Sequence, residues 1–364
     1  MKKLEINKKD IEYNLNEIKK RIEGKNVNII AVVKANGMGL DLVKYSKFLV
    51  ESGINTLAVA NFDEAIDLRL ADINEEILML SPIITKNELQ ELIEKDITLT
   101  IGSFEEFEMI ENICSKIDKK AKAHIKIDTG FGRYGFLYDD KDTVLEMLKK
   151  VQNVEITGMF THFSNAKNEK DTRLQFNRFI SIINYLKDNG YSIDCLHCSA
   201  STAFIKYPDM MLNSVRLGSI IQGRTLYEKE KFKKVGKFKS IITEIKELPK
   251  GYNISYGNTY KTKQKTKVAI VPVGYMDGLN KDKLRDDFSL KNNIISVLME
   301  FRKIFTDNSI KVKIENTDYK VIGRLGMYHS IVDISSAKNI KVGDEVELSI
   351  TPLQTNEKIR REYI

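Results

Sequence analysis

Several short segments of the chain place an ionisable side chain directly after a run of largely apolar residues. The clearest is Ala31-Val-Val-Lys-Ala-Asn36, in which Lys34 follows the β-type run Val27–Val33. A lysine at such a position is costly to bury unless it has a partner or a chemical role. Its amine could form a Schiff base with a carbonyl compound. Lys34 is therefore a candidate nucleophile, and a lysine that merely extends into solvent is the simpler alternative.

Two other motifs have a simpler structural interpretation. Gly130-Phe-Gly-Arg-Tyr-Gly135 matches the G-x-G-x-x-G pattern of NAD-binding sites, but no helix follows it directly. We therefore interpret these glycines as residues that let a loop turn tightly, with a dinucleotide site as the alternative. Cys195-Leu-His-Cys198 matches C-x-x-C, but no second ligand pair at zinc-binding spacing accompanies it. We expect buried structural cysteines there and no metal site.

The elements that must position these residues alternate between β-type and amphipathic segments over the first two-thirds of the chain. This alternation predicts a parallel sheet, and eight β-type segments are the number that closes a (β/α)8 barrel; an open doubly wound sheet is the alternative. Functional groups of such a barrel gather where its strands end. The predicted strands are Val27–Val33, Thr56–Val59, Ile77–Leu80, a run ending at Ile101, Ala123–Ile127, Val154–Phe160, Ile193–Cys198 and Val215–Gln222. The predicted helices are Leu40–Glu51, Asn61–Leu70, Lys86–Glu94, Phe104–Ile117 and Leu174–Asp188.

The last third of the chain has a different pattern, in which short β-type segments are separated by glycine-containing turns. Its predicted strands are Lys239–Leu248, Lys267–Pro272, Val312–Val321 and Glu345–Ile350, and its one helical pattern is Ile294–Phe305. We therefore expect residues 1–232 to form an α/β barrel domain and residues 233–364 to form a β-rich domain. The first few residues of the chain could pair with the second domain.

The composition is that of an ordinary globular protein and argues against several classes. The chain has 364 residues, of which 42% are hydrophobic and 30% charged, so a disordered or low-complexity protein is excluded. Its formal charge of +7 is spread along the chain, which does not indicate a nucleic-acid partner. No apolar run is long enough to span a membrane, and no signal peptide is visible. Together with three cysteines, this predicts a cytoplasmic protein.

A series of motifs resembles the alanine racemase family over nearly the whole chain. Ala31–Gly39 is similar to the family's pyridoxal phosphate (PLP) lysine motif, and the other motifs follow in the family's order. These are Asp128–Gly135, Thr161–Phe163, Ser199–Ala203, Val215–Gly218, Ser255–Gly257, Pro272–Gly278 and Gly323–Met327. Each is weakly specific alone, whereas the ordered set is specific. The resemblance implies a PLP-dependent isomerase that interconverts L- and D-alanine, which supplies D-alanine for the cell wall.

The resemblance implies two catalytic bases on opposite faces of the substrate. Lys34 would hold PLP covalently and, once the substrate amine displaces it, would act as the base on one face. Tyr256 of the partner subunit would act on the other face, so the active unit would be a homodimer with two shared sites. A phenol is a poor base near neutral pH, and we expect His162 and Arg216 to supply the positive environment that lowers its pKa.

The remaining residues carried by the resemblance would bind PLP or the substrate. Arg216 would donate a hydrogen bond to the pyridine nitrogen, which favours a racemase over the related barrel decarboxylases that carry an acidic residue there. The implied PLP-binding residues are Lys34, His162, His197, Ser201, Arg216, Gly218 and Ser219. Arg133 and the main-chain N–H of Met327 would bind the substrate carboxylate. Lys126 stands where many members carry a carbamylated lysine.

Some positions differ from the usual family pattern. Met38 and Ala200 replace residues near the PLP phosphate, and Tyr328 and Glu357 replace residues near the mouth of the site. Two alternatives to an alanine racemase therefore stay open. One is a racemase for another amino acid, such as serine or a basic one. The other is a non-catalytic PLP-binding homeostasis protein, although such proteins typically lack the second domain and Tyr256.

Overall fold

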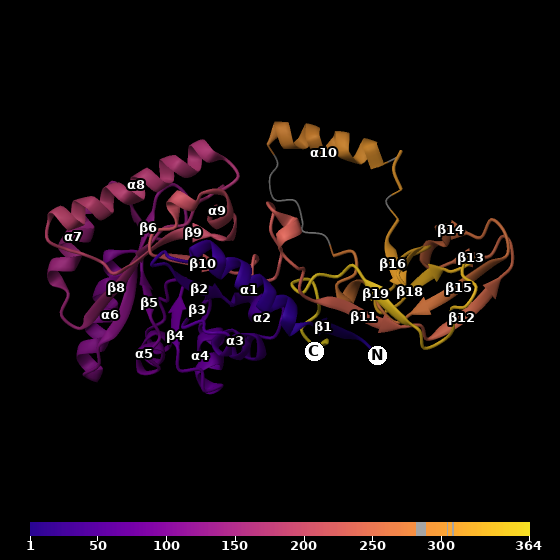
Figure 1. Cartoon of the computed structure of the whole chain (residues 1–364), viewed down its shortest axis with the longest axis horizontal. Coiled ribbons are helices and arrows are strands. Elements are labelled where there is room, and N and C mark those ends of the chain that lie inside the picture. The colour runs from indigo at the N-terminus through magenta and orange to yellow at the C-terminus, as the bar shows by residue number, and fades with distance from the viewer. Residues whose placement is uncertain (282–288, 304, 308) are drawn as a thin grey trace. The chain divides into compact units, whose positions relative to one another are not determined.

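The computed structural model describes residues 1–281, 289–303, 305–307 and 309–364, and these residues form two compact units (Figure 1). Residues 8–235 form the first unit, and residues 1–7 together with 236–364 form the second. The change of unit at residue 235 lies close to the point where the sequence pattern changes. No helix among the described residues is long and apolar enough to cross a membrane.

The first unit, whose residues 8–235 are all described, is a barrel of eight parallel strands. The hydrogen-bonded order is β4-β3-β2-β10-β9-β8-β6-β5, and a parallel bridge between Leu78 and Thr98 joins the two ends of this row. The strands are β2 (Asn28–Val32), β3 (Thr56–Val59), β4 (Glu76–Met79), β5 (Leu99–Ile101), β6 (Ala121–Asp128), β8 (Val154–Phe160), β9 (Cys195–Ala200) and β10 (Ser214–Leu217). The predicted (β/α)8 barrel is thus confirmed, and the open sheet is wrong.

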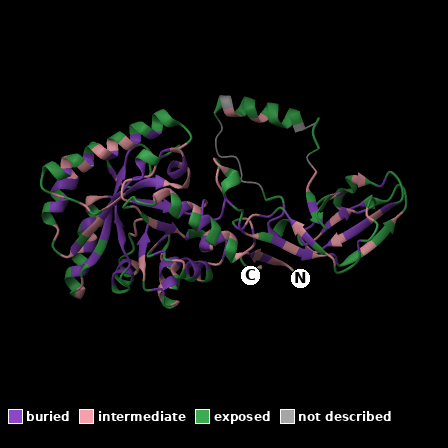
Figure 2. Ribbon diagram, in the orientation of Figure 1, coloured by how far each residue is buried: buried purple, intermediate pink, exposed green. Residues whose placement is uncertain are grey.

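Helices surround the barrel strands and bury their apolar sides against them (Figures 1 and 2). In α6, for example, Phe107, Ile110 and Cys114 recur at helical spacing and are buried. The helices are α1 (Lys8–Ile22), α2 (Lys34–Met38), α3 (Leu42–Glu51), α4 (Phe62–Leu70), α5 (Lys86–Glu94), α6 (Phe104–Ile117), α7 (Lys141–Lys150), α8 (Glu169–Asp188) and α9 (Ser201–Lys206). A short strand, β7 (Phe136–Leu137), pairs with the end of β6.

Two strands end at least two residues away from the expected position, and both of these ends lie at the site end of the barrel. The eighth strand ends at Leu217 instead of Gln222, because the chain turns away from the sheet from Gly218 onward. The seventh strand continues to Ala200 instead of ending at Cys198. Apolar residues continue into the turn after the eighth strand, so hydrophobicity alone extends that strand too far.

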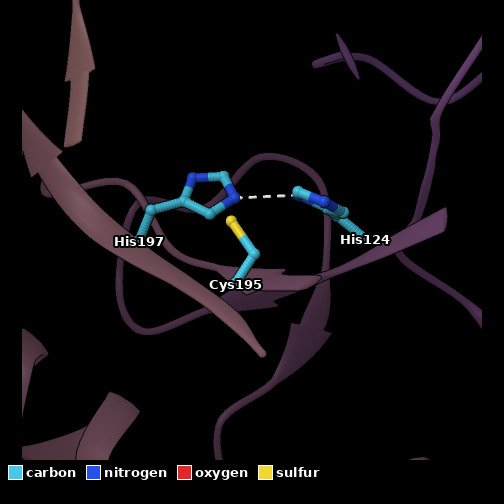
Figure 3. Close-up of side chains that lie close together, drawn as sticks. All are labelled: His124, Cys195 and His197. Atoms are coloured by element: carbon cyan, nitrogen blue, oxygen red, sulfur yellow. Dashed lines mark hydrogen bonds between the residues drawn. The ribbon is translucent and has the colours of Figure 1, made fainter. Parts of the chain in front are cut away.

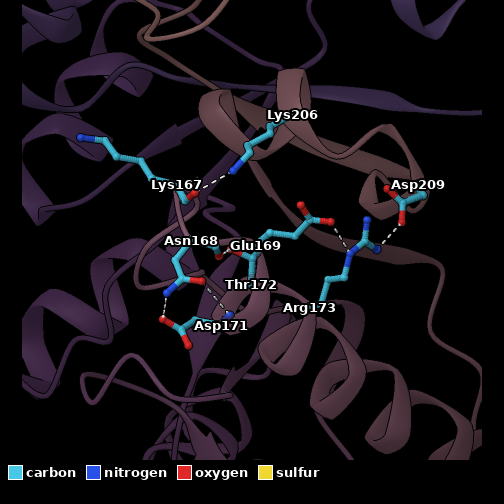
Figure 4. Close-up of polar contacts among 8 residues, drawn as sticks. All are labelled: Lys167, Asn168, Glu169, Asp171, Thr172, Arg173, Lys206 and Asp209. Carbon is cyan, nitrogen blue, oxygen red and sulfur yellow. Dashed lines mark hydrogen bonds and ion pairs between the residues drawn. The ribbon is translucent and has the colours of Figure 1, made fainter.

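Helix α8 begins at Glu169 instead of Leu174, because polar residues cap its first turn (Figure 4). The side chain of Asn168 accepts a hydrogen bond from the Asp171 N–H at 3.3 Å and donates one to the Asp171 carboxylate at 2.6 Å. Arg173, one turn later, pairs with Glu169 at 2.8 Å. An Asn cap of this kind satisfies the free N–H groups of a first turn that contains few apolar residues. A prediction based on apolar periodicity alone therefore places the start of the helix too late.

The second unit consists mainly of antiparallel sheets, and the first strand of the chain belongs to it. Strand β1 pairs with β11 in antiparallel and with β20 in parallel orientation. The sheet orders are β17-β16-β19-β11-β1-β20, β12-β15-β18 and β13-β14. The strands are β1 (Lys3–Ile6), β11 (Lys237–Ile241), β12 (Glu244–Leu248), β13 (Asn253–Ile254), β14 (Tyr260–Lys261), β15 (Thr266–Val271), β16 (Lys311–Ile314), β17 (Thr317–Lys320), β18 (Ser330–Asp333), β19 (Glu345–Leu348) and β20 (Arg360–Tyr363), and the helix is α10 (Leu290–Lys303).

Two of the strands expected in this unit are each divided. The segment Lys239–Leu248 forms parts of β11 and β12, which lie in different sheets. The segment Val312–Val321 is a hairpin, in which Glu315 and Asn316 adopt φ values of 47° and 65° between β16 and β17. Positive φ at both central residues is typical of a tight hairpin turn. The helical pattern Ile294–Phe305 corresponds to α10, and its position 304 lies outside the described residues.

Candidate active site

A cavity of about 230 Å³ opens where the barrel strands end. It brings together most of the residues that the sequence singled out, which come from five of the barrel strands or from the segments directly after them (β2, β6, β8, β9 and β10). These are Lys34, Lys126, Arg133, His162, Ser201, Arg216, Gly218 and Ser219. Met38 and Ala200, two of the positions that differ from the family pattern, also line it. Function-bearing groups at this end of a barrel are the usual arrangement for an enzyme of this fold.

Lys34 lies at this cavity at the start of a left-handed turn. Ala35, Asn36 and Met38 have φ values of 56°, 55° and 55°, which non-glycine residues rarely adopt. Such a conformation persists only where the surrounding structure enforces it. The Lys34 side chain is exposed and forms no hydrogen bond or ion pair with any residue that the structure describes. Its amine is therefore available to react with a carbonyl group.

The side chains of Glu64 and Gln222 stabilise the left-handed turn by hydrogen bonds to its backbone. Glu64 Oε1 accepts a hydrogen bond from the Asn36 N–H at 3.1 Å, and Gln222 Nε2 donates one to the Met38 carbonyl at 3.1 Å. Both side chains are buried. Sequence reasoning missed them, because they lie far from Lys34 in the chain and belong to no recognisable motif. The sequence signal that marks Glu64 is only a carboxylate within an otherwise apolar helix face.

We expect a Glu64→Ala variant to lose about 1–3 kcal/mol of unfolding free energy, because the partly buried N–H groups of Asn36 and Ala60 lose their acceptor. Urea denaturation followed by circular dichroism measures this difference. Asp67→Ala is the matched control, since Asp67 is an exposed carboxylate on the same helix. Equal stabilities of the two variants would contradict the role of Glu64 in holding the turn.

Arg216 is the central cation of the site. It is buried on β10 and donates to the carbonyl of Thr161 at 2.7 Å, to Nδ1 of His197 at 2.6 Å and to Nδ1 of His162 at 3.2 Å. Burial lowers the pKa of Arg216 to about 10, so the guanidinium stays charged near neutral pH. Its Nε–H has no partner among the described residues, although the side chain is buried and lines the cavity. That N–H is a donor left for a ligand.

The two histidines that contact Arg216 are neutral near pH 7. Burial and the charge of Arg216 lower the pKa of His162 to about 3, and the same two causes hold the pKa of His197 well below its usual range. This corrects the expectation that His162 contributes a positive charge, since the cation is Arg216. His197 does not line the cavity: it is fully buried on β9 and stacks on the Phe160 ring at 4.8 Å.

Arg133 lies on a loop that is wrapped around the carboxylate of Asp128. That carboxylate accepts hydrogen bonds from the N–H groups of Gly130–Arg133 at 2.7–2.9 Å. Gly135 adopts a φ of 118°, and a Cβ atom there would lie 2.8 Å from the Lys126 carbonyl oxygen. The glycines of the G-x-G-x-x-G motif thus serve this tight loop. The Arg133 side chain is exposed and lines the cavity, and the central carbon of its guanidinium lies 4.3 Å from the centre of the Phe131 ring.

Lys126 is a buried amine in the wall of the cavity. Its Nζ donates to the Ile127 carbonyl at 2.7 Å. Burial, followed by the nearby Arg216 charge, lowers the pKa of Lys126 to about 7. A large fraction of this amine is therefore uncharged at neutral pH, which is the form that reacts with carbon dioxide.

The depressed pKa of Lys126 predicts a pH dependence of stability. Between about pH 7 and the usual lysine pKa of 10.5, the unfolded chain binds more protons than the folded one, so the unfolding free energy should rise with pH. In carbon-dioxide-free buffer, Lys126→Met should remove this rise and stabilise the protein at pH 7 by up to about 4 kcal/mol. Urea denaturation at several pH values tests this. Lys122→Met, at an exposed position of the same strand, should change neither the stability at pH 7 nor its rise with pH. A rise with pH that persists in Lys126→Met would show that Lys126 is not its source.

Ser201, Gly218 and Ser219 form a polar part of the cavity wall. Ser201 Oγ accepts from the N–H groups of Gly218 and Ile220 at 3.3 and 3.4 Å. A Cβ atom at Gly218 would lie 3.3 Å from the Val32 carbonyl oxygen, so the close approach of the two strands favours glycine. Hydroxyl and main-chain N–H groups of this kind are the usual ligands of a phosphate group in such barrels.

Tyr256 and Met327 belong to the second unit. Tyr256 is 64% exposed and lies in a turn in which Ser255 and Gly257 both have positive φ. Met327 is 51% exposed and follows the Gly323–Gly326 segment. Both side chains are therefore on the surface of this unit.

Comparison with known proteins gives matches over nearly the whole chain. The family model described as alanine racemase, N-terminal domain, matches residues 6–225, and that for the C-terminal domain matches residues 235–361. The alanine racemase of Methanococcus maripaludis is 36% identical over 351 residues, covering 94% of this chain and 87% of that protein. The structure of the Clostridium difficile 630 alanine racemase has a TM-score of 0.87 and 30% identity, covering 100% of this chain and 95% of its own. The structure of the Bacillus anthracis alanine racemase with bound L-Ala-P has a TM-score of 0.80 and 27% identity, covering 95% of this chain and 85% of its own.

Proposed function

Because the chain belongs to the alanine racemase family, we propose that it is a PLP-dependent isomerase that interconverts L- and D-alanine. The observation that carries this proposal is a free lysine amine, Lys34, in one cavity with the unpaired Nε–H of the buried Arg216. The relatives named as alanine racemases support alanine as the substrate.

The residues present fit PLP at its aldehyde, its pyridine nitrogen and its phosphate. Lys34 offers an amine to the aldehyde. Arg216 offers its Nε–H to the pyridine nitrogen, since the other donors that it directs inward are occupied. Ser201, Gly218 and Ser219 offer the hydroxyl and the glycine-permitted close backbone that a phosphate requires. The cavity thus has a suitable partner for these three groups of the cofactor.

PLP, when bound, supplies a sink for the electron pair left on the substrate Cα atom. Arg216 keeps its own proton, because its pKa of about 10 lies far above neutral pH, so it donates a hydrogen bond without protonating the ring nitrogen. This weakens the electron sink and favours return of the proton to Cα. Arg133 binds the substrate carboxylate with its planar fork. Lys34 removes or returns the Cα proton on one face.

Proton transfer on the opposite face requires a second base, which we assign to Tyr256 of the partner subunit. Tyr256 is well exposed on the second unit, as a side chain that serves another subunit must be before assembly. The proposed active form is therefore a homodimer in which each site combines Lys34 of one chain with the tyrosine of the other. Lys126, whose amine is largely uncharged at neutral pH, is the proposed carbamylation site that orients Arg133.

The proposal is tested by incubating the PLP-loaded protein with L-alanine in D2O. We expect the Cα proton to exchange and D-alanine to accumulate, as followed by proton NMR and a D-amino-acid oxidase assay. A panel of other L-amino acids, including serine and lysine, distinguishes a racemase of different specificity. A protein that binds PLP but exchanges the Cα proton of none of them would instead be a PLP carrier.

A further inference from the structure

A chain of polar side chains runs from Arg216 through the interior of the barrel. The Nδ1 atom of His197 receives the Arg216 hydrogen bond, and its Nε2 atom lies 2.9 Å from Nδ1 of His124 (Figure 3). Nε2 of His124 lies 4.0 Å from Oε1 of Glu76, which is too far for a hydrogen bond, so this last contact is electrostatic. Glu76 is at the start of β4 and lines a second, polar cavity at the opposite end of the barrel. The chain therefore connects the two ends of the barrel.

The positions of the protons along this chain follow from its first member. A guanidinium has no acceptor, so Nδ1 of His197 must carry a lone pair and its proton must be on Nε2. That proton points at Nδ1 of His124, which must then accept it. The proton of His124 is consequently on Nε2, on the side of the Glu76 carboxylate. All donors point in one direction, from the cation towards the anion.

We propose that His124 and Glu76 are positioning residues, which hold His197 in its Nε2–H tautomer and thereby keep its Nδ1 lone pair facing Arg216. If the proton of His197 moved to Nδ1, two donors would face each other at 2.6 Å and the guanidinium would have to move. The expected effect of these residues on racemisation rests on the proposed function of Arg216. The tautomer of His197 follows from the hydrogen bonds alone and does not depend on that function.

The surroundings of both histidines support this arrangement. Burial lowers the pKa of His124 to about 3, so its ring is neutral and can act as an acceptor. The ring occupies space that β8 provides, because a Cβ atom on Gly158 would lie 2.5 Å from it. The Glu76 carboxylate is fixed by the hydroxyl groups of Thr98 and Thr56, at 3.0 and 3.2 Å. Its side chain is 38% exposed, at the mouth of the second cavity.

A bound metal ion is the competing explanation for this cluster. Cys195 lies beside the two histidines, and one potential ligand atom from each of the three residues lies within 4.8 Å of the others (Figure 3). A metal on Nε2 of His197 would need a lone pair there, which the Arg216 hydrogen bond to Nδ1 does not allow for a neutral ring. Cys195 Sγ instead donates to Ser214 Oγ at 3.3 Å. The hydrogen bonds from Arg216 to His197 and from His197 to His124 thus account for both rings without a metal.

The tautomers can be read directly from long-range 1H–15N NMR spectra of the labelled PLP-loaded protein. The chain has four histidines, so the spectrum is simple enough to assign with single-site variants. We expect His197 and His124 both to be neutral with their protons on Nε2. A proton on Nδ1 of His197, or a charged ring at either residue, would overturn the inference. Stoichiometric zinc in the purified protein, found by elemental analysis, would also overturn it.

Kinetics of matched variants provide the second readout. His124→Leu removes the acceptor and should lower kcat about tenfold with little change in KM, whereas His124→Asn retains an acceptor and should recover most of the loss. Glu76→Gln should shift the His124 resonances and lower kcat by a smaller factor. Glu155→Gln removes a carboxylate from the same cavity without touching His124 and should change neither. Equal kcat values for His124→Leu and the unmodified chain would refute the positioning role of His124. Absence of racemisation in the unmodified chain would instead refute the proposed function, and the NMR test of the tautomers would still apply.

Discussion

Replacement of Lys34 by alanine is expected to abolish covalent attachment of PLP and to lower the racemisation rate by about 10⁴-fold or more. The cavity offers one other amine, Lys126, which is buried and already donates to the Ile127 carbonyl at 2.7 Å. Lys34 alone is exposed there without a partner among the described residues. Borohydride reduction of the loaded protein, followed by peptide mass spectrometry, should therefore find the cofactor on Lys34.

The matched control is Lys34→Arg, which retains the positive charge and most of the length but not the nucleophile. It should also fail to attach PLP, which would separate the chemical role from the charge. A small primary amine added to Lys34→Ala should restore part of the proton exchange, because the cavity is open to solvent at this position. Attachment of PLP to Lys126, or an unchanged rate in Lys34→Ala, would contradict the mechanism.

The fold class could be predicted because the alternation of strands and helices is a property of local sequence. The ends of strands could not, because a hydrogen-bonded ladder ends where neighbouring strands diverge. Ile220 and Ile221 are as buried as the residues of β10, yet they lie in the turn that follows it. The pairing of β1 with both β11 and β20 likewise joins segments from opposite ends of the chain, and only weak local signals accompany such a contact.

The location of a reactive side chain at the cavity could be predicted where the side chain belongs to a motif, as for Lys34 and Arg216. The residues that support these groups were not predictable in the same way. Glu64 acts on the backbone of the Lys34 turn, and His124 acts through His197, so neither carries a spacing that indicates chemistry. The charge of His162 also could not be read from sequence, because its pKa depends on burial and on the neighbouring Arg216.

Replacement of Tyr256 by phenylalanine is expected to lower net racemisation about 10³-fold in both directions. Exchange of the Cα proton with solvent should persist for one enantiomer of alanine and be lost for the other. A base that serves only one face leaves the other face to Lys34. In D2O, one enantiomer of alanine should therefore still exchange its Cα proton with retention, whereas the other should not. Tyr252→Phe, which alters another exposed tyrosine of the same unit, should behave like the unmodified chain.

Mixed dimers test whether Tyr256 acts in the site of the other subunit. Co-expressed Lys34→Ala and Tyr256→Phe chains would form heterodimers in which one site combines both intact residues and the second site combines both substitutions. Two symmetric sites and random assembly predict recovery of about a quarter of the unmodified activity, although each variant alone is nearly inactive. A tyrosine that served its own chain would give no recovery on mixing. The same measurement thus decides between a shared site and two independent ones, because no single-chain defect can be repaired by a partner unless the partner contributes to the site.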